Sequence, residues 1–237
     1  MLNILAAERM KLKRSKLLLL CSFIAILLPL IVFPPNEYDD VSVINWVFRL
    51  QMALQLAVYP ILSGFIITFL IQKEYGDQTI INTLTAPVGR IKYLLGKLIV
   101  WLVWYLTITV CFGIIICFRV YIYFGESMFF DNLTAISMTI LRTGILYLLT
   151  LFPVVWITVL QRKVFYPSLL ITVAVTVIGL AGLLTHGISG SIIPWCAVTV
   201  ICMPNGDVIN SAAYTSIFLC AAIGLGLAVY SFKKQEL

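Results

Sequence analysis

A serine and the chain's single histidine lie together in the segment His186-Gly187-Ile188-Ser189-Gly190. A serine in such a glycine-flanked segment is typical of the nucleophile of some intramembrane proteases, which requires a histidine base within hydrogen-bond reach. In those proteases the base comes from a different helix, whereas here His186 precedes Ser189 on the same short segment. Glycine and serine are also common turn formers. The pattern therefore favours a turn over a catalytic pair.

Cysteine ligands and redox cysteines are the next chemistry to consider. Cys196 and Cys202 have five residues between them, a spacing that matches no zinc or redox motif, and the sequence leaves open whether they form a disulfide. The other four, Cys21, Cys111, Cys117 and Cys220, fall inside apolar runs, where cysteine acts as a small hydrophobic residue. We therefore predict no metal site.

A nucleotide site is not expected either. The nearest approach to a phosphate-binding loop runs from Gly89 to Lys97, with six residues between its glycines instead of four. Leu98 follows the lysine where serine or threonine is needed to bind magnesium. The chain is therefore not expected to be an enzyme or to hold a cofactor, and any ATP and magnesium must be bound by a partner ATPase.

The composition indicates the class of protein to which these residues belong. The 237 residues are 62% hydrophobic and only 11% charged, too few polar groups to cover a water-soluble core. A net charge of +6 is, in a membrane protein, an orientation signal before it is evidence for nucleic acid, which we do not expect as a partner. The sequence predicts an all-α polytopic membrane protein that forms a single transmembrane domain over 1–237.

Long apolar runs predict six transmembrane helices, since about 20 apolar residues cross a bilayer. We expect them at about 17–33, 46–71, 93–118, 136–160, 164–185 and 213–232. A further run, 192–203, is too short to cross and contains Pro194. It predicts a re-entrant or interfacial hairpin over about 186–212, between spans five and six, which neighbouring protein must shield.

Basic residues set the orientation, because lysine and arginine concentrate on the cytoplasmic side. With both termini cytoplasmic, that side receives 13 of the 16 lysines and arginines, and the re-entrant hairpin lies outside. The three that remain at the outer ends of spans are Arg49, Arg119 and Arg142. They are candidate contacts for an anionic group of a substrate, but snorkelling to the interface is the favoured explanation of arginines at such positions.

Polar residues inside the spans are few. None of the six spans contains aspartate or glutamate, which counts against an ion-coupled carrier. Span two carries Gln51, Gln55, Tyr59 and Ser63 at steps of four. This polar line predicts either a substrate path or hydrogen bonds between helices, and the second is the commoner use. In span six, the pairs Ala222/Gly226 and Cys220/Gly224 predict close helix packing.

The loop between spans two and three predicts a short amphipathic helix at about 77–84. Ile80, Ile81 and Leu84 fall on one side, Asp77 can cap its start and Pro87 limits its far end. A helix of this kind presents an apolar face that could fit a groove in another protein.

At this loop the sequence resembles the permease subunits of type-2 ATP-binding-cassette (ABC) exporters, particularly the bacitracin-resistance and lantibiotic-immunity permeases. The matching residues are Glu74, Gly76, Thr79, Leu84, Pro87, Arg90, the pair Gly96-Lys97 and the amino-terminal stretch 7–15. The resemblance implies an interfacial amino-terminal segment, a coupling helix after span two and an outer hairpin before span six. The coupling residues would be Glu74, Asp77, Thr79, Ile80, Ile81, Leu84, Pro87 and Arg90.

The resemblance further implies a function and partners. The chain is expected in the bacterial plasma membrane as the permease of an ATP-driven exporter that removes a peptide antibiotic from the lipid bilayer. Two ATPase subunits and a second permease, identical or related, would complete the assembly. The alternatives are an ion-coupled transporter and a rhomboid-like intramembrane serine protease built on Ser189.

Overall fold

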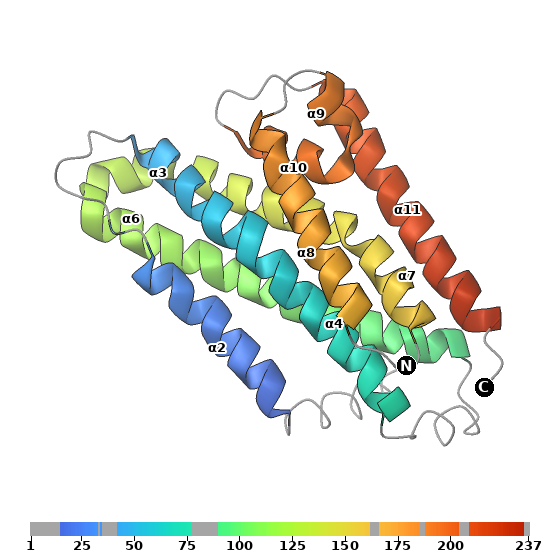
Figure 1. Cartoon of the computed structure of the whole chain (residues 1–237). Helices are drawn as coiled ribbons and strands as arrows, with labels where there is room; N and C mark the ends of the chain where they lie inside the picture. The colour runs from blue at the N-terminus through green and yellow to red at the C-terminus, as the bar shows by residue number, and fades with distance from the viewer. Residues whose placement is uncertain are drawn as a thin grey trace.

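The computed structural model describes residues 15–32, 34, 42–76, 90–161, 166–184, 188–203 and 209–234. These residues form helices and no strand, as predicted (Figure 1). Four helical stretches are long and apolar enough to cross a membrane, namely 43–73, 91–160, 166–184 and 210–234. The described part of the chain is therefore all-helical, and the protein is a polytopic membrane protein. The amino-terminal segment and the loop 77–89, with the expected coupling helix, lie outside the described residues.

The first described helix is α2 (Lys16–Ile31), at the expected first span. The Ser15 hydroxyl accepts a 3.4 Å hydrogen bond from the backbone N–H of Leu18 and so caps its start. Sixteen residues make a helix about 24 Å long, shorter than the hydrocarbon layer. One side of α2 packs on the bundle through Cys21 and Ala25, while Phe23 and Ile31 on the other side are exposed.

The expected second span lies within one continuous helical run made of α3 (Val43–Leu50), η1 (Gln51–Val58) and α4 (Tyr59–Gly76). Ser42 caps the start of α3. The middle segment, η1, is a π-helix. In a π-helix each backbone N–H donates to the carbonyl five residues earlier, so each turn is wider than an α-helical turn. The run therefore changes its winding where the polar line of the sequence begins.

The expected third and fourth spans belong to one helical hairpin. Helix α6 (Arg90–Thr150) bends at Gly125, whose φ of 85° is a conformation that glycine adopts without strain. Its second arm returns beside the first (Figure 1), so that a methyl group added at Gly113 would lie 3.7 Å from Ile140. Helix α7 (Phe152–Leu160), which begins with a proline in its first turn, extends the second arm.

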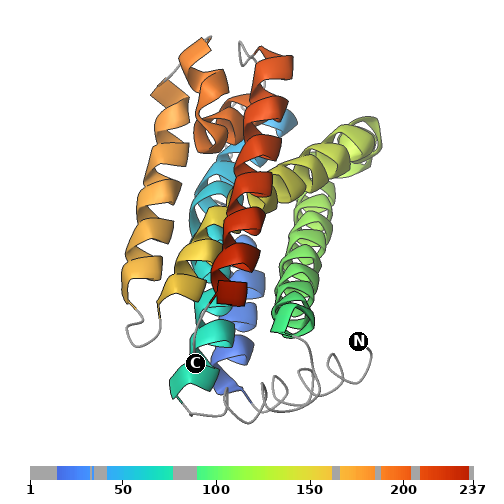
Figure 2. The same ribbon diagram turned by 90° about the vertical axis from the view of Figure 1, so that its right-hand side faces the viewer.

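Helix α8 (Tyr166–Ala181) with its extension η2 (Gly182–Leu184) and helix α11 (Asn210–Lys234) occupy the last two expected spans. Between them come α9 (Ile188–Ile192) and α10 (Pro194–Cys202), in the segment predicted as a hairpin. In Figures 1 and 2, α9 and α10 lie at the end of the bundle where α3 begins and α6 bends.

Helix α10 is enclosed by protein. All of its residues from Cys196 to Cys202 are buried. The Thr199 hydroxyl donates a 2.7 Å hydrogen bond to the carbonyl of Gly179 in α8, and the Trp195 indole N–H donates to the carbonyl of Thr150 at 3.0 Å. Neighbouring helices thus shield this short helix, as an apolar environment requires of irregular backbone. Both Cys196 and Cys202 are free thiols.

Helices α7 and α11 pack at very short range. A methyl group added at Gly224 would lie only 2.5 Å from the backbone nitrogen of Pro153, so the absence of a side chain lets the two helices meet. Gly226, by contrast, is exposed and has open space around it within this chain. Of the two pairs of small residues in α11, the one containing Gly224 therefore packs closely inside the described bundle.

Candidate functional site

The polar line of the second helical run faces the inside of the bundle. Gln51 is 1% exposed, and Gln55, Tyr59 and Ser63 are fully buried. Burying a polar group in an apolar environment costs free energy unless the group is hydrogen-bonded. The contacts of these four side chains therefore decide what the line can do.

Each of the four has a partner, mostly on another helix. Gln51 donates from Nε2 to Oε1 of Gln55 at 3.2 Å, and Gln55 donates from Nε2 to the carbonyl of Ile140 in the second arm of α6 at 2.8 Å. The Tyr59 hydroxyl donates to the carbonyl of Ala25 in α2 at 2.8 Å. The Ser63 hydroxyl accepts a 2.8 Å hydrogen bond from the indole of Trp101.

The polar line therefore ties η1 and α4 to α2 and to both arms of α6. Hydrogen bonds between helices are the commoner of the two uses that the sequence predicted, and the structure supports that use. A role of Gln51, Gln55 and Tyr59 in a substrate path stays a prediction. The line begins in a π-helix, a winding found often at functional sites.

The three arginines that the sequence predicts at outer ends of spans have different surroundings. Arg119 is 4% exposed and donates from Nη1 to the carbonyls of Pro29 and Val32 at 2.7 and 2.8 Å. Its guanidinium also lies over the rings of Trp46 and Tyr123, at 5.0 and 5.6 Å. Arg119 thus stabilises the carboxyl end of α2, whose last carbonyls have no helical partner.

Arg49 and Arg142 are exposed. Arg49 lies in the last turn of α3. Arg142, on the second arm of α6, donates from Nη2 to the carbonyl of Ile201 in α10 at 3.1 Å. The contact of all three arginines with an anionic substrate stays a prediction.

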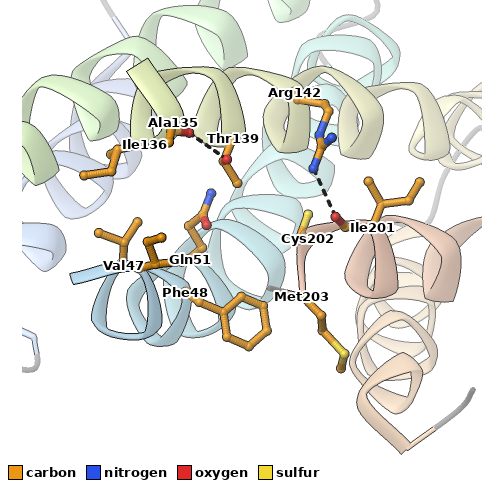
Figure 3. A pocket seen from close by; sticks show the side chains of 11 residues that line it. Val47, Phe48, Gln51, Ala135, Ile136, Thr139, Arg142, Ile201, Cys202 and Met203 are labelled. Atoms are coloured by element: carbon orange, nitrogen blue, oxygen red, sulfur yellow. Dashed lines mark hydrogen bonds between the residues drawn. The ribbon is translucent and has the colours of Figure 1, made fainter. Parts of the chain in front are cut away.

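A pocket of about 230 Å³ brings Gln51 and Arg142 to one place. Figure 3 shows Val47, Phe48 and Gln51 on one wall, Ile201, Cys202 and Met203 on the opposite wall, and the second arm of α6 spanning the two. Eleven residues line the pocket, and most of them are apolar. The eight apolar residues are Ile44, Val47, Phe48, Ala135, Ile136, Ile201, Cys202 and Met203, and the three polar ones are Gln51, Thr139 and Arg142.

Sequence reasoning found Gln51 and Arg142 but not the pocket that joins them. The walls come from segments that are far apart along the chain, and the α10 residues read only as a short apolar run. No local pattern marks such a site, because its shape depends on how three helices pack. The expected coupling residues Asp77, Thr79, Ile80, Ile81, Leu84 and Pro87 lie outside the described residues.

The structure describes the helix ends on either side of loop 77–89, where the coupling helix is expected. Helix α4 ends at Gly76 and α6 begins at Arg90, and Figure 1 places both ends at one end of the bundle, beside the carboxyl end of α11. Glu74 and Arg90 are the two charged residues predicted to flank the coupling helix. The structure does not describe their side chains. Lys73 and Lys97 lie near these ends, with Lys233 and Lys234 in the last turn of α11.

Comparison with known proteins adds independent evidence. The family model described as "ABC-2 family transporter protein" matches residues 4–179. The bacitracin transport permease of Bacillus licheniformis is 27% identical over 184 residues, which cover 74% of this chain and 84% of that permease. The match to the family model includes the second helical run, the loop after it and the helical hairpin of α6.

Proposed function

Since the chain belongs to the ABC-2 transporter family and is a multi-pass permease of the bacterial plasma membrane, we propose that it exports a peptide antibiotic out of the membrane with energy from ATP. The observation that carries the proposal is the match to a permease named for bacitracin transport, which extends over most of both chains. A lantibiotic or a bacitracin-type peptide is the proposed cargo, and its removal would give the cell immunity or resistance.

In this proposal all six expected helices cross the membrane, with both chain ends in the cytoplasm and the α9–α10 hairpin on the outside. The bundle supports it, because the start of α2, the end of α4, the start of α6 and the end of α11 lie at one end (Figure 1). Lys16, Lys73, Lys92, Lys233 and Lys234 belong to that end, and a cluster of lysines favours the cytoplasmic side.

The ATPase activity belongs to separate subunits in this proposal. Two ABC ATPase subunits would hold ATP and magnesium and would associate with two permeases, identical or related. The chain's own sequence lacks a phosphate-binding loop with the required spacing, as described for Gly89 to Lys97. The permease would therefore contribute movement of helices and no chemical step.

The coupling helix at 77–84 would dock on an ATPase through Ile80, Ile81 and Leu84. Helices α4 and α6 lead directly from this loop into the bundle, and the same helices hold Ser63 and Trp101 in hydrogen-bond contact. A displacement of the loop would therefore reach the polar line through two packed helices. Transport then requires two states of the bundle that bind cargo differently, between which ATP shifts the population.

The experiment replaces Ile80, Ile81 and Leu84 by serine together. Each substitution removes apolar contact worth about 1–3 kcal/mol without changing a predicted span. We expect normal membrane levels but loss of ATPase pull-down, or loss of antibiotic resistance with the ATPase still bound. Glu74→Ala and Arg90→Ala are the comparison variants and should weaken both readouts less, because charges at the rim of an interface contribute less than buried apolar contacts.

Wild-type resistance in the triple variant, at matched membrane levels, would refute the coupling role of this loop. Resistance that is absent even in cells with the unaltered permease and its ATPase would refute the proposed cargo instead. The two results are distinguishable because pull-down measures assembly and resistance measures transport.

A further inference from the structure

The pocket between α3, α6 and α10 has the chemistry of a site for an amphiphile. Apolar side chains form most of its surface, and Arg142 is the single charged residue among its eleven lining residues. None of these eleven is acidic. An apolar chamber with one cation at its edge complements a ligand that has an apolar chain and one negative charge.

Arg142 is held in position to meet such a charge. Its Nη2 donates to the carbonyl of Ile201, which fixes the guanidinium between α6 and α10 (Figure 3). A guanidinium has five N–H donors, so this hydrogen bond leaves donors for a carboxylate or phosphate oxygen. Arg142 is also exposed, so an acidic group can reach it without being transferred into the apolar interior.

The surface next to the pocket is apolar and accessible. Ile44, which lines the pocket, is 48% exposed, and Leu141, which precedes the lining residue Arg142 on the second arm of α6, is 40% exposed. In a membrane protein, exposed apolar side chains of this kind contact lipid chains. A chain from the bilayer can therefore enter the pocket sideways without crossing a polar surface.

The size of the pocket favours a chain over a larger molecule. Cavities that enclose drug-sized ligands measure about 300–1,000 Å³, and this pocket measures about 230 Å³. It accommodates a narrow apolar segment better than a folded peptide. We propose that the pocket binds one acyl chain of an anionic lipid of the membrane, whose acidic head group is held by Arg142.

This site goes beyond the proposed export function, because lipid binding requires neither the ATPase nor an antibiotic. It also gives Arg142 a partner of defined chemistry at the junction of α6 and α10. A lipid at this junction would stabilise the arrangement of α3, α6 and α10 around Gln51, where the polar line begins.

The test uses the full-length protein in nanodiscs of zwitterionic lipid, with a palmitic acid that carries a photoreactive diazirine on its chain. The methyl ester of the same probe serves as the neutral control. After illumination, mass spectrometry locates the labelled residues. We expect labelling concentrated at 44–48, 135–139 and 201–203, and about tenfold stronger for the acid than for the ester, as charge-assisted hydrogen bonds predict.

Two pairs of variants test separately the contribution of the Arg142 charge and that of the apolar pocket to binding of the probe. Arg142→Gln should lower labelling by the acid to the level of the ester, whereas Arg142→Lys should retain most of it. Ala135→Phe, at an exposed position that lines the pocket, should fill the chamber and reduce labelling by both probes. Met138→Phe is the matched control, since Met138 is exposed on the same helix but does not line the pocket.

Equal labelling by acid and ester in the unaltered protein would overturn the proposal, as would labels spread evenly over the lipid-facing surface. Undiminished labelling of Ala135→Phe would also overturn it. The comparison of the two probes on the unaltered protein decides the matter even if Arg142→Gln does not fold.

Discussion

Gln55 in the π-helix donates a 2.8 Å hydrogen bond from Nε2 to the carbonyl oxygen of Ile140, on the second arm of α6. Gly144, one helical turn beyond Ile140, makes room for this contact. A methyl group added at Gly144 would lie 3.1 Å from Nε2 of Gln55 and 2.5 Å from Cγ2 of Thr109. The side-chain amide of Gln55 thus joins the second helical run to the second arm of α6. At the same place Thr109, on the first arm of α6, packs against Gly144.

Replacing Gln55 by leucine should destabilise the protein by about 0.5–2 kcal/mol, because hydrogen bonds between membrane helices contribute about that much. The measurement is thermal unfolding of the purified permease in detergent. Thr107→Val is the control, since the Thr107 hydroxyl donates to Val103 in its own helix and is exposed. Equal unfolding temperatures for the two variants would show that the contact with Ile140 does not stabilise the bundle.

Gly224 and Gly226 provide a matched pair within α11. Gly224→Ala should cost about 1–3 kcal/mol, because the new methyl group would meet the backbone of Pro153 and Phe152 at 2.5 and 2.7 Å. Gly226→Ala should be neutral or stabilising by up to about 1 kcal/mol, because open space surrounds it and alanine favours helix. The same unfolding measurement applies, and the reverse order would contradict the packing of α7 against α11.

The proposed topology predicts which positions reagents can reach. In a cysteine-free background, single cysteines at positions 39 and 207 should react with a membrane-impermeant maleimide in intact cells. Cysteines at 77 and 234 should react only after the cells are opened. Labelling of position 234 from outside would contradict both the six-span topology and the outer hairpin.

Ser189→Ala should leave antibiotic resistance unchanged within about twofold, because a serine in a short helix between two spans is expected to contribute to turn hydrogen bonding and not to catalysis. Ser189 is exposed in α9, a helix of five residues. Membrane levels of the variant, measured by immunoblot, control for misfolding. Complete loss of resistance at normal levels would instead favour the rhomboid-like protease as the function of this chain.

Much of the fold could be predicted from hydropathy. Helices lie in all six expected ranges, and most of the apolar run at 192–203 forms the short, shielded helix Pro194–Cys202, because the length of an apolar run limits what it can do in a membrane. The sequence also shows the polar line, because Gln51, Gln55, Tyr59 and Ser63 follow one another at steps of four. An apolar environment favours burial of such a line between helices, and all four side chains are buried.

Long-range packing decided the rest. The sequence shows Arg119 near the outer end of a span but not that α2 would present the carbonyls of Pro29 and Val32 to it. It shows two glycines in α11 but not that only Gly224 meets Pro153. Hydropathy and spacing are local properties, whereas each of these contacts joins residues about 70–90 positions apart, and only the packed helices determine which of them meet.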